Sequence, residues 1–254
     1  MNNMRESPDD IAQGLVGKVV AERYDGHTDD PWEVAGMLRA WMPAGCRVLD
    51  IGCGTGGATA IVNEGKSNDV LCIEPDLERA AHARARRLVV HSVAFDEAFI
   101  AANGRFNVIM LSDVLEHLPN PSAMLAMIHA ALVSEGLLLL SVPNVAHWSV
   151  RLPLLFGNFE YAPAGIRDAT HLRWFTAHSI RRLMLASGFE VCKFAETAGQ
   201  HLPEYHRLPW SWLPYRVRHK IAKVGTRWMP GLFGCQHVLM CRRVEATVSE
   251  QPAL

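Results

Sequence analysis

The sequence predicts an α/β protein with a Rossmann-like, mostly parallel sheet of seven strands and helices on both faces. Segments with the apolar pattern of strands alternate with helical segments along most of the chain, which is the order that builds a parallel sheet. The run 137–142 is almost entirely apolar, as expected for a strand buried on both faces. The run 48–57 ends an apolar strand in glycines, a turn that is typical of nucleotide-like ligand sites in such sheets.

Local signals place the individual elements. Trp32, Leu38 and Trp41 recur at helical spacing before the first strand. Pro121 marks the start of a helix, and Gly188 marks a helix end at the C′ position. The expected strands are 47–51, 70–73, 88–93, 106–111, 137–142, 189–194 and 238–242. The expected helices are 8–24, 32–41, 58–63, 77–87, 121–133 and 180–187.

The length of 254 residues suits one large α/β domain with decorations. Two stretches break the alternation of strands and helices, and insertions at such places usually build substrate sites. We therefore expect a helical cap at 1–44, a core at 45–198 with a substrate loop at 144–176, a lid insertion at 199–234, a last strand at 235–243 and a flexible tail at 244–254.

Composition and charge exclude several classes of function. The net charge of -1 gives no global field that favours nucleic acid. The polar, acidic N-terminus is unlike a signal peptide, and no apolar run is long enough to span a bilayer. The six cysteines form no CxxC pair, so we expect reduced thiols, a cytoplasmic protein and no metal site.

Two acids flank the glycine turn. Asp50 lies directly before it, where a carboxylate could meet an amino group. Glu74 follows 24 residues later, at the end of the second strand, where it could accept two hydrogen bonds from a ribose diol. Three alternatives apply at this point. The glycine pattern also fits a nicotinamide dehydrogenase, and the turn could be an ordinary strand–helix corner that binds no ligand. Glu74 could instead be a solvated acid at a strand end.

A third motif follows the fourth strand directly. The run 112–121, SDVLEHLPNP, places acidic, apolar and histidine side chains at the mouth of the sheet. A nicotinamide enzyme would not require this run, and the two leading helices also count against that interpretation.

These three motifs together resemble the class I S-adenosylmethionine-dependent methyltransferases. The resemblance covers roughly residues 20–195 and includes a bacterial subgroup with PN-x-x-HW at 143–148 and THLR-x-F-T at 170–176. It implies S-adenosylmethionine as cofactor, with the methionine portion, ribose and adenine bound along the carboxyl ends of the strands. The implied cofactor residues are Tyr24, Asp50, Gly52, Cys53, Gly54, Gly56, Glu74, Pro75, Asp96, Ser112, Asp113, Val114 and His117.

Two of these residues have equally good structural interpretations. Asp96 departs from the usual pattern for adenine binding and could be the N-cap of a helix at 97–99. Tyr24 could cover the cofactor or could simply pack on the domain.

Methyl transfer to a hydroxyl would use a base, and histidine suits this role near neutral pH. We expect His171 first, with His147 and His117 as the other candidates. His117 could instead cap the turn before Pro119, and His171 could hydrogen-bond the loop backbone. The loop arginines, which either bind a carboxylate or phosphate or are solvated, are Arg151, Arg167 and Arg173.

The segment 204–228 is basic and rich in tryptophan. Such segments can contact a membrane surface peripherally. We favour a substrate lid or a homodimer contact, because the prolines should interrupt any long amphipathic helix.

The leading functional prediction is a methyltransferase that acts on an oxygen of a small molecule or of a glycan- or lipid-linked precursor. A second hypothesis is a MetW-like partner subunit of methyltransferase fold that does not itself transfer methyl, since the PN-x-x-HW run also resembles that group. No nucleic-acid partner is expected.

Overall fold

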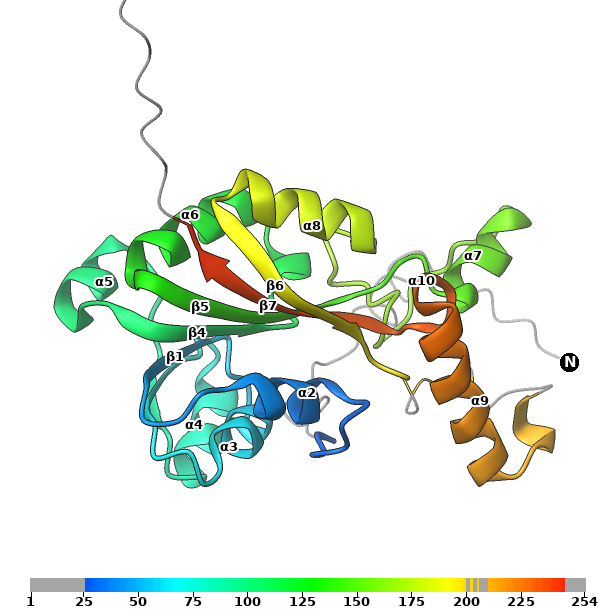
Figure 1. Cartoon of the computed structure of the whole chain (residues 1–254), viewed down its shortest axis with the longest axis horizontal. Coiled ribbons are helices and arrows are strands. Elements are labelled where there is room, and N and C mark those ends of the chain that lie inside the picture. The colour runs from blue at the N-terminus through cyan, green and yellow to red at the C-terminus, as the bar shows by residue number, and fades with distance from the viewer. Residues whose placement is uncertain (1–25, 200–201, 203–204, 206–209, 245–254) are drawn as a thin grey trace, which may run out of the picture.

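The computed structural model describes residues 26–199, 202, 205 and 210–244, in which seven strands form one sheet (Figure 1). The sheet order is β3-β2-β1-β4-β5-β7-β6. Strands β1, β2, β3, β4 and β5 pair in parallel, whereas β7 is antiparallel to both β5 and β6. The predicted fold class is confirmed. The helix expected at 8–24 lies outside the described residues.

The expected strands are all present, with small shifts at their ends. They are β1 (Arg47–Ile51), β2 (Asp69–Ile73), β3 (Val89–His91), β4 (Phe106–Ser112), β5 (Leu132–Pro143), β6 (Phe189–Glu196) and β7 (Gln236–Arg243). The largest shift is at β5, which starts five residues before the expected position. Its first part continues past an irregularity in its pairing with β4, between Phe106 and Val108.

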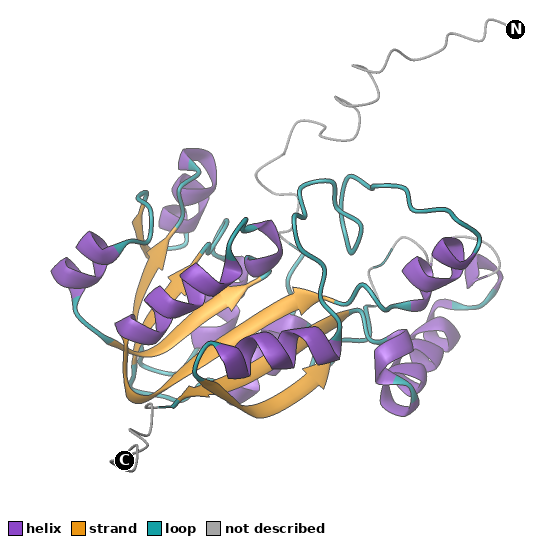
Figure 2. Ribbon diagram, turned by 90° about the horizontal axis from the view of Figure 1, so that it is seen from above, coloured by secondary structure: helices purple, strands orange, loops and turns teal. Residues whose placement is uncertain are grey.

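The helices of the described part cover both faces of the sheet (Figure 2). They are α2 (Val34–Trp41), α3 (Gly57–Asn63), α4 (Leu77–Ala85), α5 (Glu97–Asn103), α6 (Pro121–Ala131), α7 (Trp148–Leu155), α8 (Ala177–Ala186), α9 (Tyr215–Trp228) and α10 (Pro230–Phe233). One apolar core joins the sheet to α5, α6 and α8. A second core on the other face joins it to α2 and α3. None of the described helices has the length and apolar character needed to cross a membrane.

A third apolar cluster holds the two insertions together. Val150 of α7, Ile166 of the substrate loop and Ala222 of α9 belong to it, and Trp148 and Trp210 pack against it. The expectation that prolines interrupt this region is wrong for α9, a helix of 14 residues. Pro214 occupies its N-cap and Pro230 begins the next helix, so both prolines stand at helix starts, where no backbone N–H is lost.

The turn glycines predict a measurable packing constraint. Gly56 has φ +80°, and a Cβ there would lie 2.5 Å from Leu88 Cδ1 and 3.1 Å from Ala83 Cβ. We expect Gly56→Ala to lower the free energy of unfolding by about 2–4 kcal/mol, because it adds overpacking to backbone strain. Gly65 is a matched control, with φ +73° and open space around it, so Gly65→Ala should cost only about 1–2 kcal/mol. Urea denaturation of both variants measures the difference, and equal losses would refute the packing argument.

Candidate active site at the carboxyl ends of the strands

The glycine turn after β1 leaves room for a ligand. Gly52 and Cys53 donate backbone hydrogen bonds to Ile73 O, at 2.8 and 3.2 Å, which fixes the start of the turn against β2. A Cβ on Gly52 would lie 2.7 Å from Val114 Cγ2, so the post-β4 motif packs directly on the turn. A Cβ on Gly54 would have nothing within 4 Å. The turn is therefore closed on one side and open above Gly54.

Glu74 is held beside this open space. Its Oε2 accepts from the backbone N–H of Gly54 at 2.8 Å, and its Oε1 accepts from Asp76 N–H at 3.0 Å. The side chain is buried, which rules out the alternative of a solvated acid. A carboxylate offers about four acceptor positions, so two remain for another donor such as a diol.

Asp50 lies beneath the same turn. It is buried, and its Oδ2 accepts from Thr59 Oγ1 of α3 at 2.6 Å. The pKa of Asp50 is raised from 3.8 to about 6, chiefly by burial and in small part by the charge of Glu74, while the hydrogen bond from Thr59 opposes the shift. Two acids therefore meet at the turn in a desolvated setting.

Asp113 connects three strands at the same edge of the sheet. Both of its carboxylate oxygens accept from Gln236 Nε2 of β7 at 2.8 Å, and Oδ1 also accepts from Ser141 Oγ of β5 at 3.0 Å. Ser112 Oγ lies 2.9 Å from Ser141 Oγ. Asp113 has φ +52°, a left-handed conformation that this network holds in place. Burial raises the pKa of Asp113, although these hydrogen bonds counteract the shift.

The substrate loop docks on the post-β4 motif through its backbone. Glu116 O, in the 3-10 turn η1 (Leu115–His117), accepts from Leu172 N–H at 2.8 Å and from Arg173 N–H at 3.0 Å. The rings of His117 and His171 meet edge to face with centroids 4.8 Å apart. The structure thus brings together two histidines that are far apart in the sequence.

Hydrogen bonds orient both imidazole rings. His117 Nδ1 lies 3.2 Å from Thr170 O, and His171 Nδ1 lies 3.2 Å from Ile166 O. A carbonyl oxygen only accepts, so these contacts favour the neutral tautomer that carries its proton on Nδ1. The Thr170 hydroxyl, also 3.2 Å from His117 Nδ1, donates to Asp168 Oδ1 and is compatible with that tautomer. This leaves Nε2 as the nitrogen that can take up a further proton. Both histidines therefore contact loop backbone, as the structural alternative for His171 expected, in an orientation that retains a basic nitrogen.

Glu116 adds a buried carboxyl group to this pair. It is only 1% exposed, and neither carboxylate oxygen has a hydrogen-bond partner in the part of the chain that the structure describes. Burial raises the pKa of Glu116 well above its usual value, and the nearby charge of Asp113 adds to the shift. Ligand atoms of Glu116, His117 and His171 lie within 4.8 Å of one another. Chemically, this cluster could relay protons or hold a metal ion.

Comparison with known proteins shows which family the chain belongs to. A family model described as a methyltransferase domain matches residues 26–193, well over half of the chain. The chain belongs to this methyltransferase family. Its class I members use S-adenosylmethionine as cofactor, as the sequence motifs predict.

Individual relatives are more distant from this methyltransferase. The ubiquinone biosynthesis O-methyltransferase of Xanthomonas axonopodis pv. citri is 30% identical over 128 residues, which are 46% of this chain and 52% of the relative. The chain therefore spans about half the length of this curated relative.

Solved structures agree on the fold. A SAM-dependent methyltransferase from Archaeoglobus fulgidus aligns with TM-score 0.58 and 16% identity over 87% of this chain and 97% of its own. The 1,6-didemethyltoxoflavin-N1-methyltransferase of Burkholderia thailandensis, solved with its substrate and S-adenosylhomocysteine bound, aligns with TM-score 0.54 and 18% identity over 96% of this chain and 94% of its own.

The residues of the turn fit S-adenosylmethionine. The space above Gly54 is open, and Asp50 and Glu74 flank it. Neither acid pairs with a lysine or arginine among the described residues, so a cationic ligand complements the turn. Val114 packs on Gly52, whereas Pro75 is exposed beyond Glu74. Cys53 is buried, and a hydrogen bond with Cys72 raises the pKa of its thiol. We therefore expect this thiol to line the turn without reacting.

Asp96, a predicted cofactor residue, has a local structural role. Asp96 is the N-cap of α5, and its Oδ1 accepts from Phe99 N–H at 2.8 Å, which is the structural alternative expected for it. Tyr24 lies outside the described residues. Gln236, in contrast, contacts the site through Asp113 but carries no local sequence signal, because the contact joins positions 123 residues apart.

His147 has a structural role in this methyltransferase. It is fully buried, its side chain accepts from Ser149 N–H to cap α7, and burial lowers its pKa to about 3. Asn144 donates from Nδ2 to Gly234 O at 2.8 Å, and Trp148 Nε1 donates to the Tyr205 hydroxyl at 3.2 Å. The PN-x-x-HW motif therefore fastens the two insertions to each other.

The three loop arginines each donate to a backbone carbonyl. Arg151 reaches Gly231 O, and Arg167 reaches Glu160 O. Arg173 donates to Pro119 O and so ties the substrate loop to the post-β4 motif. All three side chains thus support the loops that surround the site.

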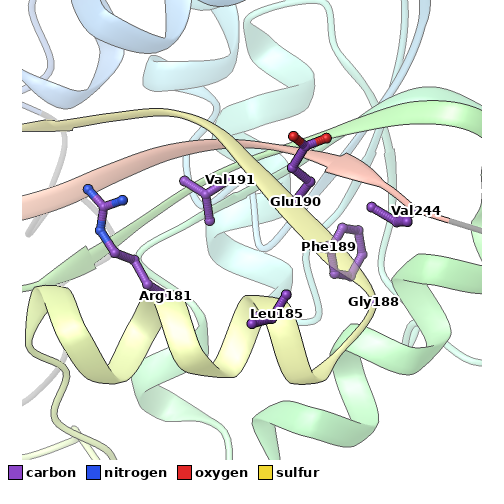
Figure 3. Close-up of a pocket in the computed structure, with 7 residues that line it drawn as sticks. All are labelled: Arg181, Leu185, Gly188, Phe189, Glu190, Val191 and Val244. Carbon is purple, nitrogen blue, oxygen red and sulfur yellow. The ribbon is translucent and has the colours of Figure 1, made fainter.

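A surface pocket of about 350 Å³ lies away from these residues (Figure 3). Arg181, Leu185, Phe189 and Val244 are among its lining side chains. Phe189 begins β6, which runs in the same direction as β5, so the pocket lies at the amino ends of the strands. The pocket therefore lies at the opposite ends of the strands from the glycine turn.

The raised pKa of Asp50 predicts that its ionised carboxylate lowers the stability of the fold while it favours binding of a cationic ligand. Because its folded pKa of about 6 exceeds the unfolded value of 3.8, ionisation of Asp50 opposes folding. The penalty is absent below pH 3.8 and complete above about pH 6. Asp50→Asn keeps an acceptor for Thr59, so we expect it to stabilise the protein by about 1–3 kcal/mol at pH 8, with a gain that shrinks toward pH 4.

Urea denaturation at several pH values measures this gain. The same variant should bind S-adenosylmethionine about tenfold more weakly or worse, since it lacks the negative charge. Asp69→Asn is the control: its side chain is 80% exposed and pairs with Arg47 at 3.5 Å on the surface, so the change should cost less than about 1 kcal/mol and leave cofactor binding unaltered. A stability difference independent of pH would contradict the assignment.

Proposed function

We propose that this methyltransferase transfers the methyl group of S-adenosylmethionine to a hydroxyl oxygen of a small molecule or of a glycan- or lipid-linked precursor. The observation that carries the proposal is the position of the His117–His171 pair. The pair forms where the substrate loop docks on the motif after β4, at the ends of the strands that also carry the glycine turn. The name of the Xanthomonas relative, an O-methyltransferase, supports oxygen as the attacking atom.

The donor side of the proposal uses Asp50, Glu74 and the turn. Glu74 is oriented by two backbone N–H groups and accepts the ribose diol. Asp50 and Asp113 supply negative charge around the methionine portion, with Ser112 and Val114 as adjacent walls. When bound, S-adenosylmethionine supplies an electrophilic methyl group on a positively charged sulfur.

The acceptor side uses the histidines. In the transfer a carbon–oxygen bond forms as the carbon–sulfur bond breaks, and the acceptor hydroxyl loses its proton. We assign that proton to Nε2 of His171, whose Nδ1 is fixed by Ile166 O. His117 lies in edge contact with His171, and the buried carboxyl group of Glu116 lies beside the pair, where it can take over the proton from the ring.

Two alternatives remain open to direct test. In the first, the chain is a MetW-like partner subunit that binds the cofactor or another enzyme without transferring methyl. Calorimetric titration with S-adenosylmethionine and S-adenosylhomocysteine tests cofactor binding, and labelling of cell extracts with a radioactive methyl donor tests transfer. Binding together with a labelled product supports the proposal. Failure of both, with co-purification of an acyltransferase, would replace it by the partner role.

Substitution of the histidines should separate chemistry from cofactor binding. We expect His171→Asn to lower kcat by about 10²–10³-fold, because the proton of the acceptor loses its base. The affinity for S-adenosylmethionine should change by less than about threefold, since His171 is not assigned to the donor side. His178→Asn, at an exposed position on α8, is the control and should be silent. A wild-type kcat for His171→Asn would remove it from the mechanism.

The second alternative is that Glu116, His117 and His171 hold a divalent metal ion that activates the acceptor. Under the proposed base mechanism, dialysis against EDTA should leave the rate unchanged. Loss of the rate with EDTA and its recovery with Mg²⁺ or Zn²⁺ would transfer the activating role from His171 to a metal ion.

A further inference from the structure

The insertion between β6 and β7, which packs against the substrate loop, has an unusual charge pattern. Residues 205–244 contain no aspartate or glutamate. Within 205–234 they carry six basic residues, which are Arg207, Arg216, Arg218, Lys220, Lys223 and Arg227. The chain as a whole is nearly neutral, so this excess is local to α9 and its surroundings. A local basic surface attracts an anionic partner at short range.

Helix α9 presents one exposed stripe of apolar and basic side chains. Val217, Lys220, Val224, Arg227 and Trp228 follow one another at spacings of three or four residues, apart from the adjacent last pair, and so share a face. All five are exposed, and Trp228 is 79% exposed. The opposite side of the helix is buried through Ala222 and Thr226.

The charges of this stripe have no ion-pair partner among the described residues. Lys223, on the inner side, pairs with Asp30 at 3.3 Å, and Arg218 donates to Tyr205 O at 2.7 Å. Lys220 and Arg227 make no ion pair within the ranges that the structure describes. The two inward-facing basic residues therefore hold α9 in place, while the outward-facing ones remain for another partner.

Further large apolar side chains are exposed at the same end of the molecule. Trp212 is 79% exposed next to the start of α9. On α7, Leu155 is 77% exposed and Phe156, directly after it, is 83% exposed. Figures 1 and 2 both place α7 and α9 at this end, and Arg151 of α7 donates to Gly231 O of α10, which lies between them.

We propose that this α7–α9 surface, formed by Leu155, Phe156, Trp212, Lys220, Val224, Arg227 and Trp228, docks peripherally on an anionic phospholipid bilayer. Tryptophan and aliphatic side chains suit the interface between headgroups and acyl chains, and lysine and arginine suit anionic headgroups. A docked bilayer covers the exposed aromatic groups and neutralises the unpaired charges together. The inference concerns binding alone, so it stands or falls independently of the proposed reaction.

Sedimentation with vesicles tests the proposal on the full chain. We expect binding to phosphatidylcholine vesicles that contain phosphatidylglycerol, little binding to pure phosphatidylcholine, and release at high salt. Lys220→Glu combined with Arg227→Glu should weaken binding by about tenfold or more, since each basic residue near an anionic surface contributes measurably. Phe156→Glu combined with Trp228→Glu should do the same by removing the apolar contact.

Helix α8 offers matched controls, because Arg182 and Leu185 are exposed there. Arg182→Glu and Leu185→Glu make the same chemical changes and should leave vesicle binding unaltered. All these positions are exposed, and thermal unfolding verifies that each variant folds. No binding to anionic vesicles, equal binding to neutral ones, or equal losses in the α8 controls would each overturn the proposal. So would a stable dimer that the Phe156 and Trp228 variants convert to monomer, because a second copy would then cover the surface.

Discussion

The burial of carboxyl groups at the carboxyl edge of the sheet is the constraint on which the rest of the site depends. Asp50, Glu74, Asp113 and Glu116 meet there, and none is paired with a lysine or arginine among the described residues. Hydrogen bonds from the backbone, Thr59 and Gln236 orient three of the four. Ionisation of such desolvated groups is costly, and a cationic ligand bound beside them offsets part of that cost.

The same constraint bears on the proposed reaction. In the proposed reaction, methyl transfer would remove the positive charge of the donor and would leave a proton on His171, near Glu116. The buried carboxyl groups would then lose a cation at the turn and gain one at the histidine pair. The thioether product is therefore attracted less strongly to the turn than the sulfonium, whereas the imidazolium stays stabilised until it releases its proton.

Sequence reasoning succeeded where the signal is local. The strand ending in Asp50 and the turn glycines depend on neighbouring residues, and their geometry follows from residue type. It missed Gln236, because no local pattern shows which residue of β7 lies beside Asp113. It could not show that His147 caps α7, because only the folded chain brings its Nδ1 to the backbone N–H of Ser149. It misjudged α9, because a proline breaks a helix only in its interior, and Pro214 stands at the N-cap.

The two insertions pack together as one unit. Asn144 and His147 fix the start of α7, Trp148 packs against the cluster that also contains Ala222 of α9, and the loop continues to His171. Ile166, whose carbonyl oxygen contacts His171, belongs to this cluster as well, so α9 and the loop that carries His171 pack on the same apolar residues. A protein that docks through the α7–α9 surface would hold its acceptor loop at a fixed distance from the bilayer. This coupling favours an acceptor with a lipid-linked portion among the classes proposed, because the surface and the site then act on the same molecule.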